Sequence, residues 1–158
     1  MTGCGSEGGI GFACASLLAR LGARVAITST TDRIAARAEE LRRDGAAVFA
    51  ATADLTDPND AQALVAEASE ELGPIEILVN NAGMTQTGRE GTGGAIADLR
   101  VDALRRQLAI SFETSFNVTQ AALPAMRDRR YGRIVMVSSV TGRLVTAPGS
   151  GEIGRAHV

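Results

Sequence analysis

Apolar residues follow two different periodicities that alternate along this chain. Short β-branched runs, such as RIVMVS at Arg133–Ser138, are separated by stretches in which apolar residues recur at helical spacing. Short continuous apolar runs are typical of strands buried on both faces of a parallel sheet, with helices covering those faces. The alternation therefore predicts an α/β fold with a doubly wound parallel sheet. The predicted strands are Arg24–Thr28, Ala47–Ala53, Ile75–Asn80 and Arg133–Ser138, and the predicted helices are Gly9–Leu21, Asp32–Asp44, Asn59–Leu72 and one long helix within Asp102–Arg129.

A glycine-rich segment, TGCGSEGGIG at Thr2–Gly11, leads directly into the first predicted helix. Glycines let a backbone turn tightly, and the unpaired N–H groups at a helix N-terminus attract phosphate groups. A glycine-rich tail would have the same composition, but the strand–helix alternation that follows is the context that a dinucleotide site requires. The segment therefore predicts a pyrophosphate-binding loop. Because a strand leads into such a loop in a doubly wound domain and none stands before Gly3, we expect the first strand of the sheet to be missing.

The residues after the next predicted strand bear on which nucleotide is bound. A dinucleotide site selects the adenosine ribose about 20 residues beyond the glycine loop, where the chain reads Thr28–Arg33. The nearest acid, Asp32, is placed to cap the following helix, and Gly45 is placed to end it. Small hydroxyls at Ser29 and Thr30, with an arginine nearby, suit a 2′-phosphate better than an acid that would repel it. We therefore expect NADP(H) in preference to NAD(H).

Composition narrows the range of partners. The net charge is −2 and aromatic residues make up 3% of the chain, which argues against a nucleic-acid-binding protein. No apolar run approaches the roughly 18 residues of a membrane span and no signal sequence opens the chain, so we expect no membrane partner and a cytoplasmic location. Cys4 and Cys14 fit neither a disulfide framework nor a zinc site, so we interpret them as small apolar residues and predict no metal site.

Three further motifs follow the glycine loop. They are Asp54-Leu55 after the run Ala47–Ala53, Asn80–Gly83 (NNAG) after the next run, and Ser139 at the end of Gly132–Ser139 (GRIVMVSS). In this order, the four motifs resemble those of the short-chain dehydrogenase/reductase family, whose nucleotide-binding domain is a Rossmann fold. The resemblance runs from Thr2 to about Gly151.

The resemblance implies a role for each matched position. The glycine loop is similar to the family's Thr-Gly-x-x-x-Gly-x-Gly, with two additional residues between Gly3 and Gly9. Ser139 matches the family's catalytic serine, and Ser111 stands where the family usually has an asparagine that supports a proton relay. The implied catalytic residues are Ser139 and Ser111, and the implied cofactor-binding residues are Gly3, Ser6, Gly9, Ile10, Gly11, Ser29, Thr30, Asp54, Leu55, Asn81, Ala82 and Gly83.

Each of the three later motifs also has a purely structural interpretation. Asp54 could open a capped turn before Thr56-Asp57-Pro58. Asn81–Gly83 could be an ordinary turn, because Asn and Gly tolerate a positive φ. Ser138 and Ser139 could be strand-end hydroxyls that cap loop amides.

The resemblance implies an oxidoreductase that transfers a hydride between NAD(P)H and a carbonyl or alcohol, with a leaning toward 3-oxoacyl-(acyl carrier protein) reductases. The substrate would be a small-molecule or acyl-carrier-bound carbonyl compound, and the full-length protein a homodimer or homotetramer. The family's general acid is a tyrosine, paired with a lysine, about thirteen residues beyond the serine. That position falls at Glu152, the chain contains no lysine, and Tyr131 precedes the strand that carries Ser139. We therefore expect this chain alone to be inactive.

The last seven residues, Glu152–Val158 (EIGRAHV), depart from the family pattern and can be encoded by a common sequencing adapter. We therefore interpret 1–151 as a partial NAD(P)-binding domain without its first strand and C-terminal third, and 152–158 as a non-native tail. The alternative to an enzyme is a non-catalytic dinucleotide-binding relative that lacks the Tyr/Lys pair. The native sequence that continues after Gly151 would distinguish the two.

Overall fold

A computed structural model describes residues 1–83 and 100–138 of the chain. In these residues, strands β1 (Val25–Ser29) and β2 (Val48–Thr52) pair in parallel, and β3 (Ile77–Asn80) and β4 (Arg133–Met136) form a second parallel pair. Ser139 and the tail 152–158 lie outside the described residues, so the predictions made for them are untested. The predicted parallel α/β arrangement is confirmed.

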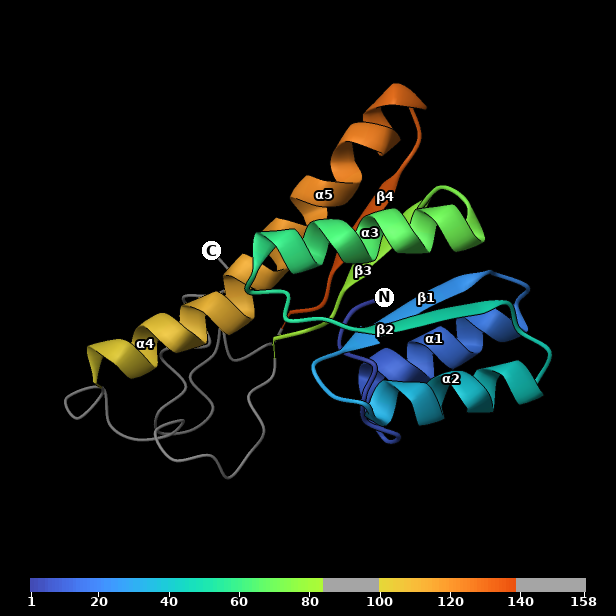
Figure 1. Cartoon of the computed structure of the whole chain (residues 1–158), viewed down its shortest axis with the longest axis horizontal. Helices are drawn as coiled ribbons and strands as arrows, with labels where there is room; N and C mark the ends of the chain where they lie inside the picture. Colours follow the sequence, from blue (N-terminus) through green and yellow to red (C-terminus); the bar gives the residue numbers. More distant parts are fainter. Residues whose placement is uncertain (84–99, 139–158) are drawn as a thin grey trace.

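Helices lie on both sides of β1 and β2 (Figure 1). Helices α1 (Ile10–Arg20) and α2 (Arg33–Arg43) lie on one side of β1 and β2, and α3 (Pro58–Leu72) and α5 (Thr114–Asp128) lie on the other. One apolar core lies under α1 and α2 and includes Phe12, Ile27 and Leu41. A second lies under α3 and α5 and includes Leu64, Leu78 and Val118. This two-sided packing explains why β1 and β2 read as apolar runs, whereas every residue of β4 is exposed.

Helix ends follow the local signals only in part. Gly45 has a φ of +83° and donates its N–H to the carbonyl of Arg42, which ends α2 as predicted. The predicted cap by Asp32 is wrong: this residue precedes α2, but its side chain makes no capping hydrogen bond. Its own backbone is already helical (φ −60°, ψ −10°), because the first turn starts at Thr31, whose carbonyl accepts from the N–H of Ile34. An N-cap residue needs an extended backbone to aim its side chain at the first amides.

The single long helix predicted within Asp102–Arg129 is interrupted. It consists of α4 (Val101–Leu108), a π-helical turn at Ala109–Glu113, and α5. The hydroxyl of Thr114 donates to the carbonyl of Ile110 at 2.8 Å and thereby engages a carbonyl within the turn. Beyond the turn, α5 buries Thr114, Val118, Ala122 and Met126, so its apolar stripe faces the core as predicted.

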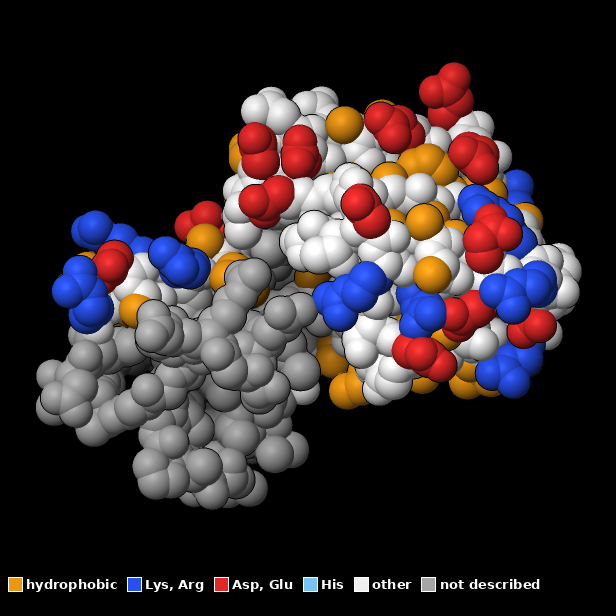
Figure 2. Space-filling model, turned by 60° about the horizontal axis from the view of Figure 1, so that its bottom comes forward, with side chains coloured by type: hydrophobic (Ala, Val, Ile, Leu, Met, Phe, Trp, Pro, Cys, Tyr) orange, Lys and Arg blue, Asp and Glu red, His pale blue; other side chains and the backbone are white. Residues whose placement is uncertain are grey.

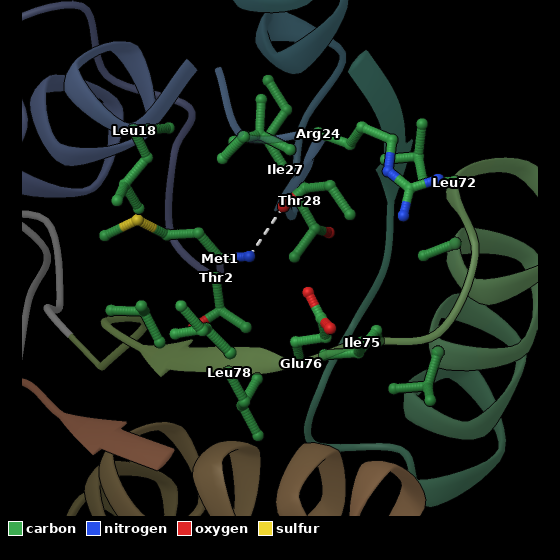
Figure 3. A pocket seen from close by; sticks show the side chains of 18 of the residues that line it. Met1, Thr2, Leu18, Arg24, Ile27, Thr28, Leu72, Ile75, Glu76 and Leu78 are labelled. Carbon is green, nitrogen blue, oxygen red and sulfur yellow. Dashed lines mark hydrogen bonds between the residues drawn. The ribbon is translucent and has the colours of Figure 1, made fainter. Parts of the chain in front are cut away.

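Residues Met1–Cys4 join the two strand pairs. The N–H of Cys4 donates to the carbonyl of Thr28 on β1 at 2.9 Å, and the N–H of Thr2 donates to the carbonyl of Val79 on β3 at 3.1 Å. Beyond Met1, the space between β1 and β3 is a cavity of about 290 Å³, which Leu18 of α1 and Leu72 of α3 help to line (Figure 3). Within the described residues, the β1–β2 pair and the β3–β4 pair are separate sheets, and Met1–Cys4 is hydrogen-bonded to both.

The surface carries both signs of charge. On the face shown in Figure 2, acidic and basic side chains are interspersed over the region of α1 and α2. Of the helices in the described ranges 1–83 and 100–138, none is both long enough and apolar enough to cross a bilayer.

Candidate dinucleotide-binding site

The glycine loop ends where α1 begins. Gly9 occupies the N-cap position in an extended conformation (φ −85°, ψ 149°), and no side chain caps the helix. The first turn of α1 also contains no acidic residue. The N-terminal N–H groups and the positive end of the helix dipole are therefore available to an anion such as a pyrophosphate.

Two neighbouring segments pack against this loop so closely that only glycine fits. A Cβ atom on Gly11 would lie 2.5 Å from the carbonyl oxygen of Gly3 and 2.6 Å from Nδ2 of Asn81. A Cβ atom on Gly5 would lie 2.8 Å from the Cβ of Ser29 at the end of β1. Gly8, in contrast, has no atom within 4 Å of its Cβ position. The structure thus brings together the loop, the end of β1 and the segment after β3, as the motif order predicts.

Thr2 joins the loop to the segment after β3, although the sequence analysis gave it no role. Its hydroxyl accepts from the N–H groups of Asn81 (3.0 Å) and Ala82 (2.9 Å), and its side chain is buried with the rest of the residue. The side-chain amide of Asn81 donates to the carbonyls of Thr2 (3.1 Å) and Gly3 (3.2 Å). The signal that could have revealed this role is the position of Thr2 as the first residue of the glycine motif.

The preceding residue, Asn80, connects β3 to α5 and to β4. Its side-chain amide donates to the hydroxyl of Thr119 on α5 at 3.0 Å and contacts the sulfur of Met136 on β4. Its carbonyl accepts from the N–H of Val137 at 2.8 Å. The chain that leads to Ser139 therefore passes beside Asn80, although Ser139 itself lies outside the described residues.

The residues after β1 form a compact hydroxyl-rich turn. The hydroxyl of Ser29 donates to the carbonyl of Thr31 at 2.7 Å, while Thr30 is exposed. Nε of Arg33 donates to the hydroxyl of Thr31 at 3.1 Å, which holds this cation at the same turn. The turn therefore presents hydroxyls and one guanidinium beside the glycine loop.

After β2, Asp54 closes a turn, as its structural interpretation predicts. One carboxylate oxygen, Oδ1, accepts from the N–H of Thr56 (3.1 Å) and from its hydroxyl (2.6 Å). Asp57 then caps α3 by accepting from the N–H of Asn59 at 2.8 Å. The side chain of Leu55 is buried in the second core, so a ligand could meet this residue only through its backbone. Asp54 therefore shapes the turn through Oδ1, and within the described residues no hydrogen bond to Oδ2 is found.

Ser111 lies in the π-helical turn, next to the segment after β3. Its hydroxyl donates to the carbonyl of Gly83 at 3.3 Å and accepts from Nε2 of Gln107 at 2.9 Å. A hydroxyl has one donor and two acceptor sites; the described residues occupy the donor site and one acceptor site of Ser111. π-Helical turns of this kind occur often at functional sites.

None of the predicted site residues within the described ranges 1–83 and 100–138 lines the 290 Å³ cavity between β1 and β3. The candidate site is instead the open edge formed by the glycine loop and the carboxyl ends of β1, β2 and β3. In an open α/β sheet, ligands bind at this edge. Within the part of the chain that the structure describes, no cluster of His, Cys, Asp and Glu side chains could hold a metal ion.

Comparisons with known proteins agree with this geometry. The sequence profile of the family described as short chain dehydrogenase matches residues 1–150. The chain is 40% identical over 145 residues to oxidoreductase UcpA of Salmonella typhimurium, covering 92% of this chain and 53% of the relative. It is 31% identical over 154 residues to D-beta-hydroxybutyrate dehydrogenase of Cupriavidus necator, covering 97% of this chain and 57% of the relative.

Solved structures show the same similarity. A mutant of actinorhodin polyketide ketoreductase, solved with NADPH, superposes with a TM-score of 0.87 at 31% identity, covering 99% of this chain and 58% of that one. A double mutant of a Serratia marcescens short-chain dehydrogenase/reductase superposes with a TM-score of 0.85 at 33% identity, covering 98% and 60%. The chain thus spans about half the length of the curated relatives it matches. It belongs to the short-chain dehydrogenase family.

Proposed function

We propose that this chain binds NADP(H) along the edge formed by the glycine loop, as part of an oxidoreductase that transfers a hydride between the nicotinamide and a carbonyl or alcohol. The observation that carries the proposal is the packing of Gly11 against Gly3 and Asn81, in front of an uncapped and acid-free helix N-terminus. Gly11 lets α1 pack closely against Gly3 and Asn81, and the uncapped start of α1 supplies the N–H donors that a pyrophosphate requires. The similar ketoreductase that was solved with NADPH supports the choice of ligand.

We also assign residues to the two halves of the cofactor that flank the pyrophosphate, the adenosine half and the nicotinamide half. We assign the adenosine ribose to Ser29 and Thr30, the adenine to Asp54 and the backbone of Leu55, and the nicotinamide side to Asn81–Gly83. Preference for NADP(H) is supported by the guanidinium of Arg33, which is held at the Ser29 turn through Thr31. A guanidinium and hydroxyls favour a phosphate group at this position.

The bound nicotinamide would supply or accept the hydride, and the protein would position the reactants and handle the proton. We propose that Ser139 orients the substrate oxygen and that Ser111, fixed by Gln107 and Gly83, holds a water with its remaining lone pair. The chain has no lysine, and its one tyrosine, Tyr131, lies before β4. The proton donor and its cationic partner are therefore proposed to come from residues outside this sequence, and the 158-residue chain is expected to be inactive by itself.

Two relatives point to a substrate class. One is named a polyketide ketoreductase, which denotes reduction of a ketone, and another a D-beta-hydroxybutyrate dehydrogenase, which denotes oxidation of a 3-hydroxy acid. We therefore propose a 3-oxoacyl or related carbonyl substrate, free or bound to an acyl carrier. A cytoplasmic location is supported by the free thiols of Cys4 and Cys14, which suit a reducing compartment.

We also propose that the whole protein is a homodimer or homotetramer. The outer face of the π-helical turn and α5 exposes Phe112, Phe116 and Leu123, and the first two rings stack with centroids 6.4 Å apart. Exposed aromatic clusters of this kind mark protein–protein contacts. Size measurement of the whole protein by light scattering tests this, since a monomer would contradict it.

Titration with NADPH, followed by the change in its fluorescence, tests cofactor binding. Gly11→Ala should abolish binding, because its Cβ collides with backbone and with Asn81, whereas Gly8→Ala should bind as the wild type does. Equal affinities for the two variants would contradict the proposed site. NADH measured in parallel tests the preference for NADP(H).

Sequencing the gene that encodes these residues tests whether the whole protein has the proposed catalytic activity. A native reading frame with Tyr-x-x-x-Lys after Gly151 supports the enzyme and assigns 152–158 as a non-native tail. A native frame that encodes Glu152–Val158 and lacks the pair supports the second candidate, a non-catalytic dinucleotide-binding protein, which the absence of lysine favours.

A further inference from the structure

One side chain of α5 reaches across to the loop that follows β2. Nδ2 of Asn117 lies 3.0 Å from the carbonyl oxygen of Leu55 and 3.3 Å from that of Thr56, residues more than sixty positions earlier in the chain. Asn117 is half-buried between the two elements. These two hydrogen bonds connect the helix to the loop directly.

The loop needs an outside partner at these two carbonyls. β2 ends at Thr52, and α3 begins at Pro58, so the intervening residues have no ladder or helix of their own. The turn satisfies other groups internally: the carbonyl of Asp54 accepts from the N–H of Asp57 at 2.9 Å, and the carboxylate of Asp54 accepts from Thr56. The carbonyls of Leu55 and Thr56 are directed to α5 instead, where Asn117 donates to both.

We propose that Asn117 is a positioning residue for the adenine end of the cofactor, acting by fixing the backbone of Asp54-Leu55 against α5. The inference rests on the proposed function, because it assumes that the adenine lies at Asp54-Leu55. It assigns to Asn117 an effect on one half of the cofactor only. The nicotinamide side is held separately, by Thr2 on Asn81 and by Ser111 on Gly83.

An amide is the side chain that this position requires. Two carbonyl oxygens face Nδ2, and a primary amide has two N–H donors to offer them. An aspartate of the same size would place carboxylate oxygens against both carbonyls and repel them. An alanine would remove the donors without repulsion, which gives a milder variant for comparison.

The test uses the whole protein encoded by the gene that contains these residues. Dissociation constants are measured for NADPH and for reduced nicotinamide mononucleotide, which lacks the adenosine half. We expect Asn117→Asp to raise the Kd for NADPH about tenfold, the loss that follows from disrupting hydrogen bonds to a positioned group, and Asn117→Ala to raise it less. The Kd for the mononucleotide should stay within about twofold of the wild type for both variants.

Gln120→Glu is the matched control, because it makes the same amide-to-carboxylate change at an exposed position of α5. It should leave both constants unchanged. The decisive quantity is the ratio of the two constants, since partial unfolding would weaken both ligands equally and leave the ratio constant. An unchanged ratio in Asn117→Asp and Asn117→Ala overturns the inference alone, while wild-type protein that binds neither ligand overturns the proposed function and this inference with it.

Discussion

Asn81 donates two hydrogen bonds to Thr2, one from its backbone and one from its side chain. The hydroxyl of Thr2 accepts from the backbone N–H of Asn81 at 3.0 Å, and the side-chain amide of Asn81 donates to the backbone carbonyl of Thr2 at 3.1 Å. The two residues are 79 positions apart. They fix the start of the glycine loop against the end of β3, and so set the distance between the two segments to which we assign the pyrophosphate and the nicotinamide.

Replacing Thr2 with valine should therefore destabilise the fold. Valine has the shape of threonine but cannot accept the N–H groups of Asn81 and Ala82. Leaving a buried donor unsatisfied costs about 1–3 kcal/mol. The free energy of unfolding in urea should fall by that amount or more in Thr2→Val and much less in Thr2→Ser, which keeps the hydroxyl. A serine variant as unstable as the valine variant would assign the effect to the methyl group instead.

The two cysteines should react at very different rates. Cys4 is fully buried, and burial raises the pKa of its thiol to about 11, so little thiolate forms at neutral pH. Cys14 is exposed on α1. Iodoacetamide at neutral pH should modify Cys14 alone, as read by peptide mass spectrometry, and should modify both in concentrated urea. Modification of Cys4 in the folded protein at the rate of Cys14 would show that the region around Met1–Cys4 opens.

The amino terminus should make stability depend on pH. Burial lowers the pKa of the Met1 ammonium from its ordinary value of 8.0, although the group donates to the carbonyl of Ala26 at 2.6 Å. Between the lowered pKa and 8.0, the unfolded chain binds a proton that the folded chain does not. The free energy of unfolding of the 158-residue chain should therefore rise with pH between the lowered pKa and 8.0. Below the lowered pKa, Met1 is protonated in both states and the free energy of unfolding should no longer change with pH because of this group. Chemical denaturation at several pH values measures the slope, and Nα-acetylated chain, which cannot titrate there, should lack this component.

Truncation of Leu41 should be costly, and truncation of Leu17 should not. Leu41 on α2 is 2% exposed in the first core, whereas Leu17 on α1 is 56% exposed. Leu→Ala at a buried site costs about 2–5 kcal/mol, because it removes apolar contact and leaves a cavity. Urea unfolding of Leu41→Ala and Leu17→Ala compares the two; a similar loss in both variants would show that the face of α1 bearing Leu17 is covered in solution.

Local sequence was sufficient for the order and type of the elements. Each predicted strand overlaps the observed one and its ends differ by at most two residues, and Gly45 ends α2 as its backbone freedom suggests. These features depend on apolar periodicity and on backbone preferences, which act over a few residues. The glycine loop was also identified, since its composition and its position before a helix are local properties.

Local sequence was insufficient where a distant partner or a neighbouring turn decides the geometry. Asp32 does not cap α2, because the chain is already helical there. The π-helical turn at Ala109–Glu113 breaks one periodic pattern into two helices. Asp54 had two interpretations, and the structure shows it closing a turn through one carboxylate oxygen, Oδ1.

The amino-acid sequence by itself determined the parallel α/β character of this protein, its glycine loop and the residue types at the cofactor edge. Only the tertiary structure decided that Thr2 holds Asn81, that Asn117 reaches the carbonyls of Leu55 and Thr56, and that Gln107 orients Ser111 towards Gly83. The long-range contacts of Thr2 and Asn117, like the bond from Ser111 to Gly83, join residues between 28 and 80 positions apart. Such pairs form because parallel strands place their carboxyl ends at one edge, and no local pattern records which side chains meet there.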